Sequence, residues 1–412
     1  MHNCTGIVLS MIVLIALPGC ADRAAPPAGT PRETSLEGGR RLARQFLIVD
    51  THVDIPHRLA RRMADISVRT RGGDFDYPRA REGGLDAPFM SIYVSASYQE
   101  SGGAKEYADK LIDMVESFQE KWPDKFVVAR SVAEVRAAFQ NARIAMPMGM
   151  ENGAPIEGSL ASLEHFYERG IRYITLAHSR ANHISDSSYD SNRRWQGLSP
   201  FGRKVVEEMN RLGIMIDISH VSDDAFDQVV ALTKAPVIAS HSSCRHFTPG
   251  WERNMSDDMI QTLAGNGGVI QIAFGSSFIS NDYRLRHAQR NQTIDDHLRK
   301  LGMTRNHPRA QEQIRQSEQE NQLQRATVSQ VADHIDHVRN LVGIDHVGFG
   351  SDFDGVGDTT PAGLKDVSYY PNLLAELLDR GYNEEAIEKI CSGNLLRVWS
   401  EVERVAAETR QR

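Results

Sequence analysis

Residues 45–57 read QFLIVDTHVDIPH, an apolar run that leads into His52 and Asp54, two residues apart. In a β-strand, side chains two residues apart point to the same face, so this pair could hold one cation. The alternative is that Asp54 caps the following turn and His52 is a hydrogen-bonded core residue; an isolated pair favours this alternative. The rest of the chain has to decide between the two interpretations.

The composition indicates a globular protein with a sizeable core. The chain has 412 residues, of which 41% are hydrophobic and 25% charged, and this excludes a disordered or fibrous protein. The net charge is −7 and no concentrated basic run occurs. Since binding to phosphate groups needs a positive surface, we expect no nucleic-acid partner.

The N-terminus has the features of an export signal. Residues 1–19 contain an apolar core from Ile7 to Leu17, too short to span a bilayer, although the usual basic start is missing. The ending LPGC resembles a bacterial lipobox, which implies cleavage before Cys20 and a lipid on that cysteine. Residues 20–36 would then be the lipidated N-terminus and a flexible tether. We therefore expect an exported protein, lipid-anchored to a bacterial membrane and facing the periplasm or the cell surface.

Two of the four cysteines, Cys4 and Cys20, belong to this leader and anchor. The remaining two, Cys244 and Cys391, are too few for a disulfide framework. We interpret both as small buried residues and leave open whether they pair.

Eight short apolar runs, separated by amphipathic helical patterns, predict eight parallel strands covered on both faces. The runs are 46–54, 87–96, 142–151, 171–179, 214–221, 235–243, 267–275 and 346–354. Helices are predicted at 106–122, 159–170, 199–213, 222–235 and 256–266, with Ser222 and Ser256 as N-caps and Gly170 and Gly213 as stops. This repeat predicts a closed (β/α)8 barrel over residues 37–412. An open doubly wound sheet is the alternative, but no Gly-rich phosphate loop follows the first strand.

The predicted strand ends carry a chemically uniform set of side chains. They are His52, Asp54, Glu151, His178, His220, His241, Asp352 and Asp354. Each alone is explained as a cap or a core histidine, but active sites of such barrels form where the strand ends converge. Burying so many charges together would be costly without a cation, so the set predicts a metal site.

The donor types favour zinc over manganese, cobalt or iron, since imidazole nitrogens are mixed with carboxylates and thiolates are absent. The set exceeds one tetrahedral shell. Two metals roughly 3.5 Å apart, sharing one bridging carboxylate and one hydroxide, would use it better.

Several motifs together resemble, in order and spacing, the membrane dipeptidase (renal dipeptidase, peptidase M19) family. The motifs are DTHVD (50–54), GMENG (149–153), LAHS (176–179), DISHVS (217–222), SHSS (240–243), RN (253–254) and GFGSDFDG (348–355), followed by GLSPFG (197–202) and NLLRVW (394–399) as further matches. The resemblance covers nearly the whole chain after the tether. It implies a metal-dependent hydrolase of the TIM-barrel type.

The resemblance also implies a ligand set for two zinc ions per chain. His52 and Asp54 match the ligands of one zinc, and His220 and His241 match the ligands of the second. Glu151 matches the carboxylate that bridges both ions together with a hydroxide.

Further roles carry over from the family to single positions. His178 matches the residue that contacts the substrate and polarises its carbonyl, and Arg253 matches the arginine that grips the terminal carboxylate. Asp352 matches the acid that handles the proton at the scissile amide. Asp354 is interpreted as a supporting or structural residue.

The resemblance therefore implies a zinc dipeptidase acting on dipeptides with a free C-terminal carboxylate, with D-residues on the C-terminal side as an open question. ENGAPI (151–156) replaces a glycine–histidine version of the motif, which leaves the side-chain preference open. The polar segment 281–326 is interpreted as a solvated helical insertion at the rim of the site. A homodimer is one option for the oligomeric state.

Two alternative functions remain. One is another binuclear metal barrel hydrolase, acting on a cyclic amide or lactone; the H-x-D start and the lack of a strand-ending lysine argue against it. The other is a non-catalytic, lipid-anchored metal- or peptide-binding protein. The presence of His178 and Asp352 argues against this second alternative.

Overall fold

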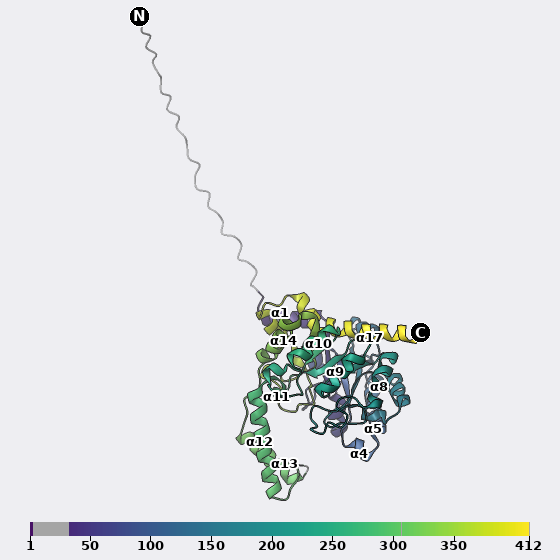
Figure 1. The fold of residues 1–412 in the computed structure, drawn as a ribbon. Helices are drawn as coiled ribbons and strands as arrows, with labels where there is room; N and C mark the ends of the chain where they lie inside the picture. Colours follow the sequence, from purple (N-terminus) through teal and green to yellow (C-terminus); the bar gives the residue numbers. More distant parts are fainter. Residues whose placement is uncertain (3–32, 306, 412) are drawn as a thin grey trace. The chain divides into compact units, whose positions relative to one another are not determined.

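Eight parallel strands form one nearly closed barrel, as predicted (Figure 1). In order around the barrel they are β1 (Ile48–Val53), β2 (Leu85–Tyr93), β5 (Met148–Glu151), β6 (Ile171–Thr175), β7 (Met215–Asp217), β8 (Ile238–Ser242), β9 (Val269–Ile272) and β10 (Val347–Phe349). The ends of β1 and β10 meet where Asp54 N donates to Phe353 O at 2.9 Å and Asp352 N donates to His52 O at 3.0 Å. The closure brings the first and the last motif of the chain together.

The computed structural model describes residues 1–2, 33–305 and 307–411. Cys20 and nearly all of the predicted leader and tether lie outside the described residues. Helix α1 begins at Ser35, and Ser35–Arg412 form one unit. Among the helices of the described residues, none combines the length and the apolar composition that crossing a membrane requires.

All eight predicted strands are present, but the run 142–151 is divided by a proline. Ile144–Met146 (β4) pairs with Phe126–Val128 (β3) in a separate two-stranded sheet, and the chain then joins the barrel as β5. Pro147 separates the two strands; it has no N–H to donate, but its carbonyl accepts from Met90 N at 2.8 Å. The two halves of this apolar run therefore belong to two different sheets.

Helices follow most of the strands, and the five predicted ones are confirmed. The α-helices are α1 (Ser35–Gln45), α2 (Ile55–Arg61), α3 (Tyr77–Gly83), α4 (Tyr98–Ser101), α5 (Ala104–Lys121), α6 (Val132–Gln140), α7 (Leu160–Glu168), α8 (Pro200–Leu212), α9 (Asp223–Leu232), α10 (Asp257–Gly265), α11 (Ser276–Ile279), α12 (Asn281–Lys300), α13 (Pro308–Glu320), α14 (Val328–Val342), α15 (Tyr370–Asp379), α16 (Glu384–Glu388) and α17 (Asn394–Arg410). Shorter helical turns are η1 (Ala154–Ile156), η2 (Arg245–Phe247), η3 (Ile344–His346), η4 (Val367–Tyr369) and η5 (Lys389–Gly393). Ser222 and Ser256 cap α9 and α10 through their hydroxyls, and Gly213 ends α8 with φ +91°.

The amino-terminal ends of the strands are filled by an apolar core. Side chains from β1, β2, β6, β7, β8 and β9 form one cluster with Leu395 and Trp399 of α17, and the Trp399 ring lies 5.4 Å from that of Phe89. Helix α17 thus closes this end of the barrel, which leaves the carboxyl ends of the strands for polar side chains.

The segment 281–326 contains α12 and α13, which lie next to each other (Figure 1). Most of its side chains are polar, and Ile294, Leu298, Ala310 and Ile314 form a small apolar cluster of their own. The insertion therefore adds little to the main core.

Cys244 and Cys391 are both buried and carry free thiols, as expected of small core residues. Burial raises the pKa of both thiols, so they stay protonated.

Candidate metal centre

The predicted site residues converge at the carboxyl ends of the strands. His52 is on β1, Glu151 ends β5 and His241 is on β8, while three others follow β6, β7 and β10: His178, His220 and Asp352. His220 and Asp352 adopt left-handed backbone conformations, with φ +66° and +64°. Such conformations are unfavourable for non-glycine residues and cluster at functional sites, where the surrounding fold holds them.

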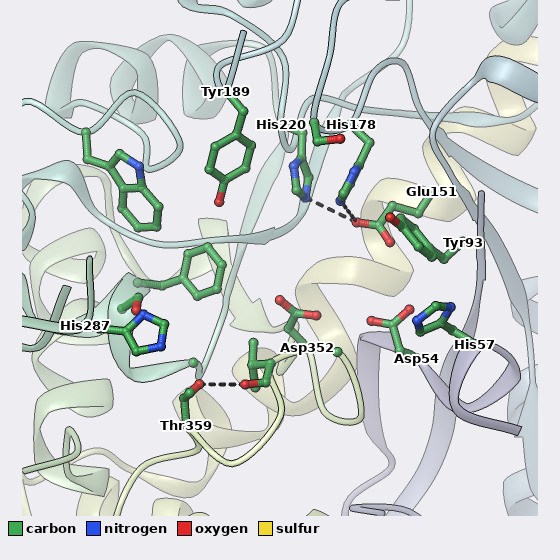
Figure 2. A pocket seen from close by; sticks show the side chains of 17 residues that line it. Asp54, His57, Tyr93, Glu151, His178, Tyr189, His220, His287, Asp352 and Thr359 are labelled. Atoms are coloured by element: carbon green, nitrogen blue, oxygen red, sulfur yellow. Dashed lines mark hydrogen bonds and ion pairs between the residues drawn. The ribbon is translucent and has the colours of Figure 1, made fainter. Parts of the chain in front are cut away.

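Glu151 lies at the centre of the cluster, and its two carboxylate oxygens face different residues (Figure 2). Oε1 lies 3.2 Å from His220 Nε2, 3.4 Å from His241 Nε2 and 3.3 Å from His178 Nε2. Oε2 lies 3.5 Å from His52 Nε2, which is in turn 3.5 Å from Asp54 Oδ2. The carboxylate therefore stands between two groups of ligands, as a bridging carboxylate would.

Two of the histidines are oriented by hydrogen bonds to the opposite ring nitrogen. His52 Nδ1 bonds the Tyr173 hydroxyl at 2.8 Å, and His241 Nδ1 bonds Ser240 Oγ at 2.8 Å. Ser240 Oγ in turn donates to Asp217 Oδ2 at 2.6 Å. These partners leave both Nε2 atoms aimed at Glu151, which is the arrangement that supporting residues give to metal-binding histidines.

The electrostatic environment favours the ligating forms of three residues. Burial, reinforced by the charge of Arg253, lowers the pKa of His220 and His241 well below the ordinary value, so both imidazoles are neutral. Burial would raise the pKa of Glu151, but the adjacent His178 and His52 more than offset it, and the pKa falls well below its usual range. Two neutral imidazoles and an ionised carboxylate are what a metal ion requires.

His52 is the exception in the protein alone. Burial lowers its pKa, but Tyr173 and the carboxylates of Glu151 and Asp54 raise it well above the ordinary value. A proton on His52 then offsets the neighbouring negative charge, which is the same role that a bound cation would have.

Unpartnered atoms show that the site fits a metal pair. His52 Nε2 and Asp54 Oδ1 are buried without a hydrogen-bond partner. His220 Nε2 and His241 Nε2 are 2.8 Å apart, and each lies within 3.4 Å of Glu151 Oε1. Buried nitrogens and oxygens gathered this closely are what a metal ion requires of its ligands. The donor set of histidines and carboxylates, with Glu151 between its two halves, therefore fits a binuclear metal centre.

Asp352 and Asp354 differ in environment although they are two residues apart. Burial raises the pKa of Asp352 well above its usual range, and the nearby carboxylates of Asp54 and Glu151 act in the same direction. Its carboxyl group points into the cavity (Figure 2). The oxygens of Asp354 are instead occupied by Arg58 Nε at 2.8 Å and Asp74 N at 2.6 Å. Asp354 thus connects helix α2 to the loop at Asp74 and does not reach the cluster.

Arg253 is buried beside the cluster, with 2% of its surface exposed. Its guanidinium donates to Ser242 Oγ at 2.8 Å and His241 O at 2.7 Å, and Nη2 lies 3.1 Å from His220 Nε2. Nε has no hydrogen-bond partner. The side chain therefore has a donor to spare, behind the cavity wall formed by Phe278, whose ring lies 5.0 Å from its guanidinium carbon.

The cluster opens into a cavity of about 580 Å³ (Figure 2). Of the candidate metal ligands, Asp54, Glu151 and His220 line the cavity, whereas His52 and His241 lie behind its surface. The aromatic rings of Tyr189, Trp251 and Phe278 also line it. His287 of α12 lies across the cavity from Glu151. The insertion thus contributes to the site.

The sequence interpretation missed several polar residues of the cavity wall, among them Tyr93, His57, Tyr189 and His287. Tyr93 is the last residue of β2, so inspection of every strand end could have identified it. Burial raises the pKa of its hydroxyl to about 12. His57 lies within the stretch 45–57, and its ring contacts that of Tyr93 at 4.9 Å. Tyr189 lies outside the strands and the quoted motifs, and His287 lies in the insertion that was predicted at the rim of the site, without a pattern that singled out this residue.

The chain is similar in sequence to a known family of peptidases. The sequence profile of the family described as membrane dipeptidase (peptidase family M19) matches residues 36–412. Dipeptidase aclJ of Aspergillus oryzae is 36% identical over 81% of this chain and 71% of its own length.

Two solved structures share the fold. The probable dipeptidase PvdM from Pseudomonas aeruginosa has a TM-score of 0.78 and 26% identity, over 92% of this chain and all of its own (100%). A metallo peptidase from Rhodobacter sphaeroides, solved with a phosphinate mimic of the dipeptide L-Ala-D-Ala, has a TM-score of 0.71 and 26% identity, over 87% of this chain and 99% of its own.

Proposed function

Because this chain belongs to the membrane dipeptidase family, peptidase family M19, and is therefore a metallo-dipeptidase, we propose that it uses two zinc ions to hydrolyse dipeptides that have a free C-terminal carboxylate. The observation that carries the proposal is the position of Glu151, with Oε2 toward His52 and Oε1 toward His220 and His241. His52 and Asp54 would hold one ion, His220 and His241 the other, and Glu151 both. When bound, such a pair lowers the pKa of water and polarises the substrate carbonyl.

The residues around the ions would position the substrate and move the proton. His178, partly exposed at the cavity wall, is placed to donate a hydrogen bond to the substrate carbonyl oxygen as charge develops there. Asp352 points into the cavity, and its raised pKa suits a group that accepts a proton and passes it to the leaving amine.

Arg253 is proposed to recognise the terminal carboxylate of the substrate. Its unpartnered Nε offers a charge-assisted hydrogen bond that a neutral amide could not match. We further propose that D-residues are accepted on the C-terminal side, since the Rhodobacter sphaeroides relative was solved with a mimic of L-Ala-D-Ala.

Metal analysis combined with a dipeptide panel tests the proposal. We expect two zinc ions at the Glu151 centre, turnover of L,L and L,D dipeptides, and a large loss of kcat/KM when the C-terminus is amidated. Equal rates on free and amidated dipeptides would exclude the carboxylate recognition. A metal content of one per chain at full activity would exclude the binuclear assignment.

We also propose that Cys20 is lipidated and anchors the exported protein to a bacterial membrane, because LPGC resembles a lipobox. The wild type should partition into detergent, whereas Cys20→Ser should yield soluble or uncleaved protein. Equal partitioning of a cleanly cleaved Cys20→Ser protein would rule out this anchor.

A further inference from the structure

A second cluster of metal-ligating side chains lies outside the dipeptidase cavity. His246 is in η2, Asp257 is the first residue of α10, and His337 is in α14; none of them lines that cavity. Each offers one ligand atom, and the three atoms lie within 4.8 Å of one another. His337 Nε2 is 2.8 Å from Asp257 Oδ1, and the rings of His246 and His337 stack with centroids 4.4 Å apart and an angle of 25° between them.

The chemistry of the cluster suits a transition-metal ion. Two imidazoles and one carboxylate are a common donor set for zinc, and cobalt and nickel accept it as well. The stacked rings of His246 and His337 bring one nitrogen of each imidazole close to the Asp257 carboxylate. His246 is exposed and the other two are partly exposed, so water can complete the coordination.

A surface ion pair is the simpler explanation for part of this arrangement. It accounts for the contact between His337 and Asp257, which by itself is worth little. It does not account for His246, which packs its ring on that of His337 and brings a third ligand atom to the same point. A cation between the three ligand atoms would give all three residues a common role.

The three ligands come from two parts of the chain, one loop region and a helix that follows it by about eighty residues. His246 and Asp257 flank the loop between η2 and α10, which carries Trp251 and Arg253, whereas His337 belongs to the neighbouring helix α14 (Figure 1). A cation bound by all three would connect both ends of this loop to α14. The loop in turn provides part of the aromatic wall of the cavity.

We propose that His246, Asp257 and His337 bind one divalent transition-metal ion, zinc foremost, which ties residues 244–256 to α14. The proposal does not depend on the number of ions at the Glu151 centre. It adds a metal site that has no part in the hydrolysis.

Metal content measured against matched variants tests the site. The full chain, loaded with its own metals and dialysed against micromolar zinc, should hold one more zinc per chain than either His337→Ala or His246→Ala. His297→Ala removes an exposed histidine from α12 and serves as the control; it should keep the wild-type content. A crystal grown with zinc should show an anomalous difference peak between the three side chains.

Hydrogen–deuterium exchange tests the tie between the loop and α14. Zinc should slow exchange in residues 244–256 of the wild type but not of His337→Ala. Equal zinc content in the wild type and both variants would overturn the site, and zinc binding without slower exchange would overturn the tie. If His337→Ala does not fold, the exposed His246→Ala answers both questions.

Discussion

At the scale of single residues, the site depends on how differently the fold treats chemically similar side chains. Glu151 and Asp352 are both buried carboxyl groups in one cavity, yet the pKa of Glu151 is lowered by His178 and His52, against the effect of burial, while burial and neighbouring carboxylates raise that of Asp352. The first environment favours a permanent metal ligand, and the second favours a group that exchanges protons.

This difference predicts different outcomes for two isosteric substitutions. Glu151→Gln should lose bound metal and activity together, because the amide cannot replace a charged bridge between the two ligand groups. Asp352→Asn should keep nearly all of its metal while kcat falls by roughly 10²–10⁴-fold, the usual contribution of general acid–base catalysis. Metal analysis and steady-state kinetics on the same preparations check both. Metal loss in Asp352→Asn as complete as in Glu151→Gln would show that Asp352 is a ligand.

A second residue-scale prediction concerns Tyr173, which orients His52. Tyr173→Phe removes the hydroxyl that lies 2.8 Å from His52 Nδ1 and leaves the packing of the ring with Phe89 intact. Metal affinity should fall by roughly 10–100-fold, the range found for the loss of such a supporting partner. Competition with a chelator measures the affinity. Unchanged affinity would mean that packing alone holds the His52 ring.

At the scale of elements, the insertion 281–326 adds a side chain to the wall of a cavity whose candidate metal ligands come from the barrel strands and the segments after them. Helix α12 begins at Asn281, directly after the short helix α11, and presents His287 to the cavity. Burial lowers the pKa of His287, with Arg290 acting in the same direction, so this imidazole is neutral. A neutral group across the cavity from Glu151 is placed to contact the substrate and not the reacting atoms (Figure 2).

His287→Ala should therefore change substrate binding more than turnover. We expect KM to rise by roughly 2–10-fold, as for the loss of one hydrogen bond of about 0.5–1.5 kcal/mol, with kcat nearly unchanged. Steady-state kinetics across the dipeptide panel measures both constants, and His297→Ala on the same helix is the control. A lower kcat at constant KM would instead place His287 in the chemical step.

At the scale of the whole molecule, the two ends of the barrel differ in the polarity of their side chains. The carboxyl ends of the strands gather charged side chains around Glu151, while the amino-terminal ends pack against α17. One carboxylate nevertheless lies at the amino-terminal end: Asp86 accepts from Ile48 N at 3.2 Å and so links β1 to β2. Burial raises its pKa to about 7, although Ile48 N and Arg81 act in the opposite direction.

The raised pKa of Asp86 predicts how global stability responds to pH. Between an unfolded pKa of about 3.9 and the folded value of about 7, only the folded protein keeps the proton, so the free energy of unfolding falls as pH rises through this window. Asp86→Asn should remove this loss and be more stable than the wild type at pH 8, by on the order of 1–3 kcal/mol. Urea unfolding of both proteins at pH 5 and pH 8 measures the difference. Parallel pH dependence in the two proteins would exclude the effect.

Local patterns of the sequence were sufficient for the barrel strands and for the candidate side chains at their ends, whereas the ligand roles were predicted from the resemblance to a family. Apolar runs of strand length can be buried between two layers, and six of the eight runs end at a His, Asp or Glu that a parallel barrel must bring to one edge. The prediction missed β3 (Phe126–Val128) and treated β4 and β5 as one strand across Pro147, because apolar content alone does not tell which sheet a residue joins. Resemblance to a family supplied the roles of His178 and Arg253.

Contacts between distant segments were decided only by the tertiary structure. The division of Glu151 between two groups of ligands, the support of His241 by Ser240 and Asp217, and the place of His287 in the cavity wall all depend on atoms brought together by barrel closure. The same holds for His246, Asp257 and His337, which no motif connects. The side-chain period of a strand or helix determines which face a residue occupies, but the distance across a closed barrel is set by the packing of all its strands and helices.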